Sequence, residues 1–77
     1  MDTRVAVISI IVENPEAIET LNHLIHEAGQ DIIGRMGIPY REKGINIISI
    51  AIDAPQDVIS TLSGKIGRLS GISTKTA

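Results

Sequence analysis

The 77-residue chain contains no cysteine, no phenylalanine and no tryptophan, and its single aromatic residue is a tyrosine. The absence of cysteine excludes disulfide bonds, thiolate metal sites and iron–sulfur clusters held by cysteine. The apolar content is instead dominated by sixteen isoleucines. Isoleucine is branched at Cβ and suits the pleated surface of a sheet, so this bias favours strands.

Basic charge and long apolar runs are also scarce. The net charge is −2, whereas nucleic-acid-binding domains are usually basic, so we expect no direct contact with nucleic acid. No apolar run approaches the roughly 20 residues that cross a bilayer, and the first residues lead into a strand without a separate signal segment. We therefore expect one domain spanning residues 1–77, cytoplasmic and not bound to a membrane.

Two segments, residues 4–12 and 44–53, are apolar on both of their alternating faces. This pattern is typical of strands at the centre of a sheet. At an offset of 40 residues the segments repeat, with Ile8-Ser9-Ile10 matching Ile48-Ser49-Ile50. The repeat predicts a chain built from two similar halves.

A helix is expected after each of these strands. Asn14 as N-cap and Pro15 at the first helical position open the first helix, and Gly29 is expected to end it. Its apolar stripe recurs at helical spacing and consists of Ile18, Leu21, Leu24, Ile25 and Ala28. The second helix follows Pro55 and ends before Gly71, with an apolar face made of Val58, Ile59, Leu62, Ile66 and Leu69.

One further strand completes each half. Residues 31–38 form an edge strand because Pro39 cannot donate a backbone hydrogen bond to a ladder, and residues 72–75 form a short last strand. The resulting order βαββαβ predicts an α+β, ferredoxin-like sandwich: a four-stranded antiparallel sheet with two helices on one face. The two strands that are apolar on both faces then form the central pair.

The helices of such a fold cover only one face of the sheet. We assign the even-numbered apolar side chains of the central strands to the helices. The other face then carries Val5, Val7, Ser9, Ile11, Ile45, Ile47 and Ser49. A patch of this size exceeds what monomers usually expose, so we predict a homo-oligomer, dimer or tetramer, that buries it. The alternative is a stable monomer that tolerates a partly exposed apolar sheet.

The polar side of the first helix carries a possible metal-binding cluster. Glu19, His23, His26 and Glu27 lie three, four and seven residues apart, and imidazoles and carboxylates so placed can ligate zinc or nickel. An ordinary solvated helix face explains the same residues and is the preferred interpretation. We therefore expect no metal and no other cofactor, with a site of His23, His26 and Glu27 as the alternative.

The candidate effector site lies around the turn between the predicted strands at residues 31–38 and 44–53. Two guanidiniums and a phenol can hold a carboxylate or phosphate, and a solvated hairpin is the alternative. The candidate residues are Arg35, Tyr40, Arg41 and Lys43, together with Asn14 in the turn after the first strand. No nucleophile–base pair, carboxylate dyad or dinucleotide fingerprint is present, so we expect no catalysis.

Two motifs resemble those of a known family, the iron-only hydrogenase system regulators. They are GRMGIPYREKGI at residues 34–45 and LSGKIGRLSGI at residues 62–72, and the resemblance extends over nearly the whole chain. It implies an ACT-like ferredoxin fold, similar to the regulatory domain of the nickel-responsive repressor, and an association with hydrogenase maturation proteins.

The chain departs from those related domains in two places. The nickel-responsive domain takes its metal with histidines and a cysteine around its central strands, where this chain offers only Asn46, Ser49 and Asp53. Many ACT domains bind an amino acid near a glycine after the first strand, where this chain has Glu13-Asn14-Pro15. We expect a non-catalytic regulatory module that binds a small effector at a subunit boundary or docks onto a regulatory protein. The alternative is a metal-binding sensor.

Overall fold

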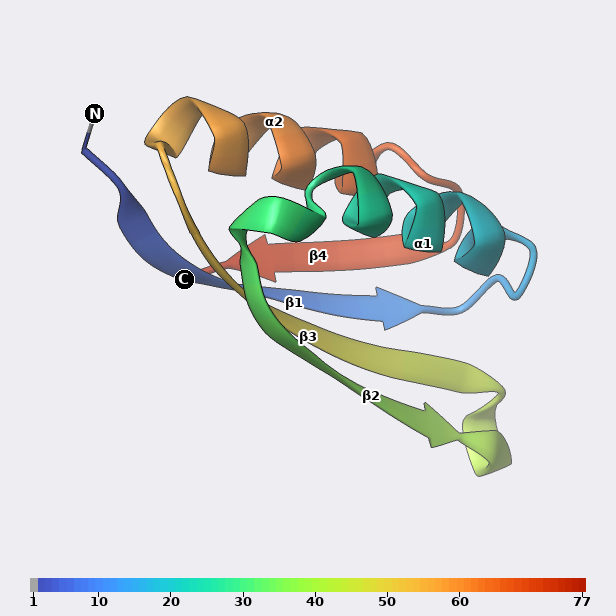
Figure 1. The fold of residues 1–77 in the computed structure, drawn as a ribbon. Helices are drawn as coiled ribbons and strands as arrows, with labels where there is room; N and C mark the ends of the chain where they lie inside the picture. The colour runs from blue at the N-terminus through green and yellow to red at the C-terminus, as the bar shows by residue number, and fades with distance from the viewer. Residues whose placement is uncertain (1) are drawn as a thin grey trace.

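The computed structural model describes residues 2–77, which form four strands and two helices in the order βαββαβ (Figure 1). The elements are β1 (Arg4–Val12), α1 (Ala17–Glu27), β2 (Ile32–Tyr40), β3 (Ile45–Ala54), α2 (Gln56–Gly67) and β4 (Ile72–Thr76). A 3-10 turn precedes β2 at Gly29–Asp31, and another follows it at Arg41–Lys43. The predicted order of elements is confirmed.

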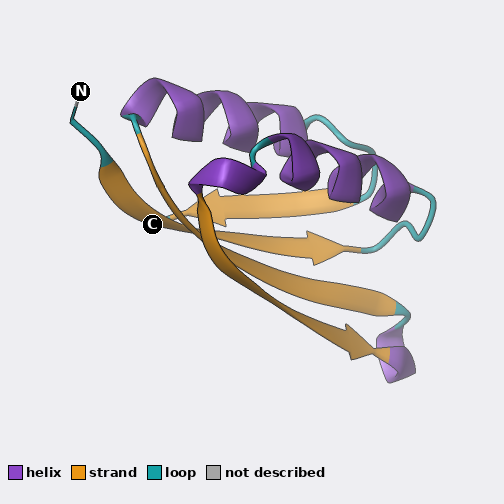
Figure 2. Cartoon of the chain, viewed as in Figure 1, coloured by secondary structure: helices purple, strands orange, loops and turns teal. Residues whose placement is uncertain are grey.

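The sheet has the strand order β2-β3-β1-β4, with every neighbouring pair antiparallel. The two repeated segments lie directly against each other at its centre, because Ser9 pairs with Ser49 and Ile8 with Ile50. Both helices lie on the same face of the sheet (Figure 2). This is the ferredoxin-like topology that the repeat predicts.

The core lies between the helices and the even-numbered side chains of the central strands. Its sheet side is made of Ala6, Ile8, Ile10 and Val12 of β1 and Ile48, Ile50, Ile52 and Ala54 of β3, all buried. Its helix side is made of Leu21, Ile25, Ile59, Leu62 and Ile66. The assignment of the even-numbered face to the helices is confirmed.

Strand β2 departs from simple alternation at its start. Ile32 pairs with Ile52 and Gly34 with Ala51, so Ile33 is an extra residue in a β-bulge. Every residue of β2 after Ile32 is exposed. The end of the β2–β3 hairpin extends beyond the helices, which accounts for the elongated shape of 43 × 20 × 19 Å (Figure 1). β2 is an edge strand as predicted, although it runs through Pro39 to Tyr40 instead of ending at Ile38.

The ends of α1 differ from the sequence prediction. The helix begins at Ala17, two residues after Pro15, while the Oδ1 atom of Asn14 accepts a hydrogen bond of 3.1 Å from the amide of Glu16. Gly29 does not end the helix with a left-handed residue, because α1 ends at Glu27 and the chain continues into a 3-10 turn. The helix thus stops just before Gly29, close to the predicted end, although Gly29 does not adopt the left-handed backbone common for a glycine after a helix.

Two other glycines hold a left-handed backbone in the described residues. Gly44 has φ = 64° before β3, and Gly71 has φ = 75° before β4. A side chain at Gly71 would overlap Asn14, whereas one at Gly44 would meet no heavy atom within 4 Å. Gly71 therefore permits a close approach between the turn that enters β4 and the turn that leaves β1. Neither helix in residues 2–77 has the length and hydropathy needed to cross a membrane.

Candidate functional site

The sheet surface that faces away from the helices, here called the open face, is the most apolar part of the exposed surface. Across its middle, Ile11 pairs with Ile47, and Ile47 pairs on its other side with Ile38. Seven of the eight exposed large hydrophobic residues in the described part of the chain lie on it: Val5, Val7, Ile11, Met36, Ile38, Tyr40 and Ile47. The eighth is Ile33 at the bulge, so no exposed large hydrophobic belongs to a helix.

The strand register places the predicted interface residues on this open face. Ser9 pairs with Ser49 at its centre, and Ile45 of β3 pairs with Tyr40 of β2. The predicted interface did not include Met36, Ile38 and Tyr40, which extend the apolar surface onto β2. The alternation of residues along β2 did not reveal them, because the bulge changes which residues of the strand face the helices and which face away.

The residues of the candidate effector site do not converge on one point. Arg35 pairs with Ile50 on the helix side of the sheet, whereas Tyr40 pairs with Ile45 on the open face. Arg41 and Lys43 lie in the 3-10 turn that follows β2. Asn14 lies before α1, against Gly71, and its side-chain oxygen binds the backbone of Glu16. Arg35 thus lies on the opposite face of the sheet from Tyr40, and the remaining candidates lie in two separate turns.

On α1, two of the potential metal ligands lie next to each other. The Nε2 atom of His23 lies 3.1 Å from Oε1 of Glu27, and both side chains are largely exposed. His26 lines a different surface hollow, near Arg35. In residues 2–77 no group of three histidine, aspartate or glutamate side chains is placed to hold a metal ion. The His23, His26 and Glu27 alternative therefore has two neighbouring ligands and lacks the third.

The polar residues of the central strand β3 do not form a ligand cluster either. Ser49 lies on the open face opposite Ser9, and Asp53 lies on the same face opposite Val5. Asn46 is opposite Val12, on the other side of the sheet. The three side chains lie on two different faces of the sheet, so they form no common site for a metal ion on β3.

We expect zinc and nickel titrations, followed by calorimetry, to show no binding tighter than micromolar. Structural zinc sites use four protein ligands and catalytic ones three, whereas His23 and Glu27 supply two. A His23→Ala variant should therefore give the same titration as the unmodified protein. Sub-micromolar binding that this variant loses would contradict the expectation.

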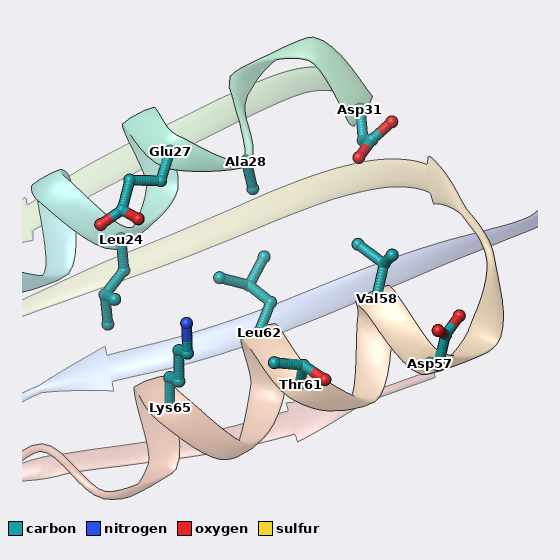
Figure 3. A pocket seen from close by; sticks show the side chains of 9 residues that line it. All are labelled: Leu24, Glu27, Ala28, Asp31, Asp57, Val58, Thr61, Leu62 and Lys65. Atoms are coloured by element: carbon teal, nitrogen blue, oxygen red, sulfur yellow. The ribbon is translucent and has the colours of Figure 1, made fainter.

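A groove of about 290 Å³ lies between the two helices. Figure 3 shows Ala28, Val58 and Leu62 in its middle, Asp31 and Asp57 at one end, and Leu24, Glu27 and Lys65 at the other. No histidine or cysteine lines it, and Thr61 supplies its only hydroxyl. The groove offers apolar and charged contact surface but no nucleophile with a neighbouring base.

The sequence and the structure were both compared with known proteins. The sequence model of the TM1266-like family, described as "Iron-only hydrogenase system regulator, putative", matches residues 4–76. The structure of the uncharacterized protein TM1266 from Thermotoga maritima superimposes with a TM-score of 0.95 at 35% identity, covering 99% of this chain and 96% of that one. The comparison with curated proteins found no match.

Two more distant structures are similar in fold alone. A formyltetrahydrofolate deformylase from Pseudomonas putida KT2440 matches with a TM-score of 0.68 at 10% identity, over 96% of this chain but only 28% of the enzyme. CPII, a nitrogen regulatory PII-like protein from Thiomonas intermedia K12 bound to ADP, AMP and bicarbonate, matches with a TM-score of 0.57 at 15% identity, over 100% and 97%. The family match and the Thermotoga relative show that the chain belongs to the TM1266-like family of iron-only hydrogenase system regulators.

Proposed function

We propose that the protein is a non-catalytic regulatory module of an iron-only hydrogenase system, that it works as a homo-oligomer, and that it binds a small effector or docks onto a regulatory protein. The family description supports the part of the proposal that names the iron-only hydrogenase system. The absence of a nucleophile–base pair or a carboxylate dyad from the candidate sites supports a role in binding. The oligomer rests on one observation, the apolar open face.

Covering the open face would recover a large part of the stability of a small domain. Its seven large hydrophobic side chains are between 39% and 65% exposed. Fully burying a side chain of this size is worth about 1.5–3 kcal/mol, so covering these would contribute roughly 5–10 kcal/mol per subunit. For two subunits the sum exceeds the lower estimates of about 4–15 kcal/mol for the entropy that association costs. An open face paired with another open face is therefore energetically sufficient.

A second copy of the chain suits this surface better than a charged partner does. Within the strands, the open face carries one carboxylate, Asp53, and one ammonium, Lys75. Neither belongs to the central row of Ile11, Ile38 and Ile47, since Asp53 pairs with Val5 and Lys75 with Ser9. A two-fold axis brings the same patch together from both subunits, so a patch without net charge avoids repelling itself. We therefore assign the open face to a homo-oligomeric contact.

The regulatory role is tested in a reconstituted maturation reaction for an iron-only hydrogenase. We expect the purified protein, added in molar excess, to change the yield of active hydrogenase. The Ile47→Lys variant, whose open face can no longer be buried, is the matched comparison. An unchanged yield with the unmodified protein would contradict the proposed function, and an equal effect of both proteins would show that regulation does not need the oligomer.

A further inference from the structure

A second surface feature, distinct from the open face, surrounds the guanidinium of Arg35. It is a hollow of about 480 Å³ between the C-terminal half of α1, the following 3-10 turn and the first half of β2. The residues that line it are Asn22, Ile25, His26, Gly29, Ile32 and Arg35. None of them is acidic, although the chain as a whole is.

The guanidinium is held in place by an uncharged partner. An Nη atom of Arg35 donates a hydrogen bond of 3.2 Å to Oδ1 of Asn22 on α1. Within residues 2–77, the only carboxylate in an ion pair is Glu27, whose partner is His23. The charge of Arg35 is therefore oriented but not neutralised. An oriented guanidinium without a counter-ion is suited to a carboxylate or a phosphate, which it can bind through two parallel hydrogen bonds.

The other polar groups of the hollow are also left as donors. The amide of Asn22, whose oxygen accepts from Arg35, still has both of its N–H bonds to offer. The ring of His26 adds a further N–H. Ile25, which is buried, and Ile32, which is half-buried, provide an apolar wall beside these donors. Donors and apolar wall together fit a small anion that carries a hydrocarbon part.

We propose that this hollow binds a small organic anion, a carboxylate or phosphate monoester, with Arg35 as the anchoring residue and Asn22 as the residue that positions it. The inference deepens the effector-binding part of the proposed function and rests on it. It differs from the sequence prediction, since Tyr40, Arg41 and Lys43 lie elsewhere and do not contribute. Gly29 lines the hollow, and the space beside its Cα is open, because a Cβ atom there would meet no heavy atom within 4 Å.

The test is a titration of isotope-labelled protein followed by nuclear magnetic resonance. The probes are butyrate and butyl phosphate, with butylamine as a ligand of similar chain and opposite charge. We expect one or both anions to shift the amide signals of residues around the hollow, with butylamine leaving them in place. The anion that binds more tightly distinguishes a carboxylate effector from a phosphate ester.

Two arginine variants connect the shifts to the hollow. Arg35→Gln should weaken anion binding about tenfold or more, because hydrogen bonds to a charged group are among the stronger ones. Arg41→Gln removes the same charge from the turn after β2 and should leave binding unchanged. No shift with either anion, equal shifts with butylamine, or unaltered binding by Arg35→Gln would each overturn the proposal. The molar mass of the same samples tests the oligomer separately. A failure to bind anions would therefore overturn the anion site without contradicting the oligomer.

Discussion

The Ile47→Lys variant is expected to be a folded monomer at concentrations where the unmodified protein is an oligomer. Ile47 lies in the middle of the open face, between Ile11 and Ile38, and is 39% exposed in the single chain. A lysine there can extend into water in the monomer, whereas in the oligomer its ammonium would be buried without a partner. With two lysines per dimer, the contact should lose at least about 3 kcal/mol, a factor of more than ~100 in the dissociation constant.

Light scattering after gel filtration measures this change, with circular dichroism to check that the variant is folded. The matched control is Thr20→Lys, which adds the same charge at an exposed position of α1 on the opposite side of the molecule. It should keep the molar mass of the unmodified protein. If Ile47→Lys remains an oligomer while Thr20→Lys dissociates, the subunit contact involves the helices and not the open face.

Replacing Gly71 with alanine is expected to destabilise the fold by roughly 2–5 kcal/mol. Gly71 has φ = 75°, a conformation that costs an L-residue about 1–2 kcal/mol. The added methyl group would also overlap the side chain and backbone of Asn14, and such overpacking typically costs about 1–3 kcal/mol. Urea unfolding gives the free energy of unfolding, measured at one protein concentration because an oligomer adds its own concentration dependence.

Gly44→Ala separates the two causes. Gly44 has nearly the same backbone conformation, with φ = 64°, but its Cβ position is open. This variant should lose only the conformational part, about 1–2 kcal/mol. Equal losses in both variants would show that the approach of Gly71 to Asn14 is relaxed at little cost, and would contradict the close contact described above.

The architecture was predictable because one pattern occurs twice in the chain. Each half has a strand that is apolar on both faces and a helix after it, and the segments around Ser9 and Ser49 become direct neighbours in the sheet. Even the choice of face followed from the side chains, since the larger even-numbered set, such as Ile10 and Ile50, is the buried one. Periodicity and bulk carry this information because burial depends on them directly.

The candidate sites were less predictable, and β2 shows why. A single extra residue at Ile33 reverses the faces of the strand, which brings Met36, Ile38 and Tyr40 to the open face and leaves Arg35 on the helix side. No local signal in an edge strand with two glycines and a proline fixes that bulge. It depends on the register with β3, which is a property of the folded sheet.

The exact ends of α1 were less predictable than its position in the chain. Pro15 and Gly29 are residue types that often mark a helix start and a helix stop. The helix α1 begins at Ala17, two residues after Pro15, and ends at Glu27, two residues before Gly29. A residue that suits a cap does not by itself decide whether the helix reaches it.

The most direct test of the central claim is the molar mass of the unmodified protein in solution at micromolar concentration, by light scattering or sedimentation equilibrium. One chain has a mass of 8.2 kDa. Burial of the open face against another copy predicts at least twice that mass. A mass of 8.2 kDa that persists as the concentration is raised would mean that the apolar open face remains exposed, and would contradict the oligomeric regulatory module proposed here.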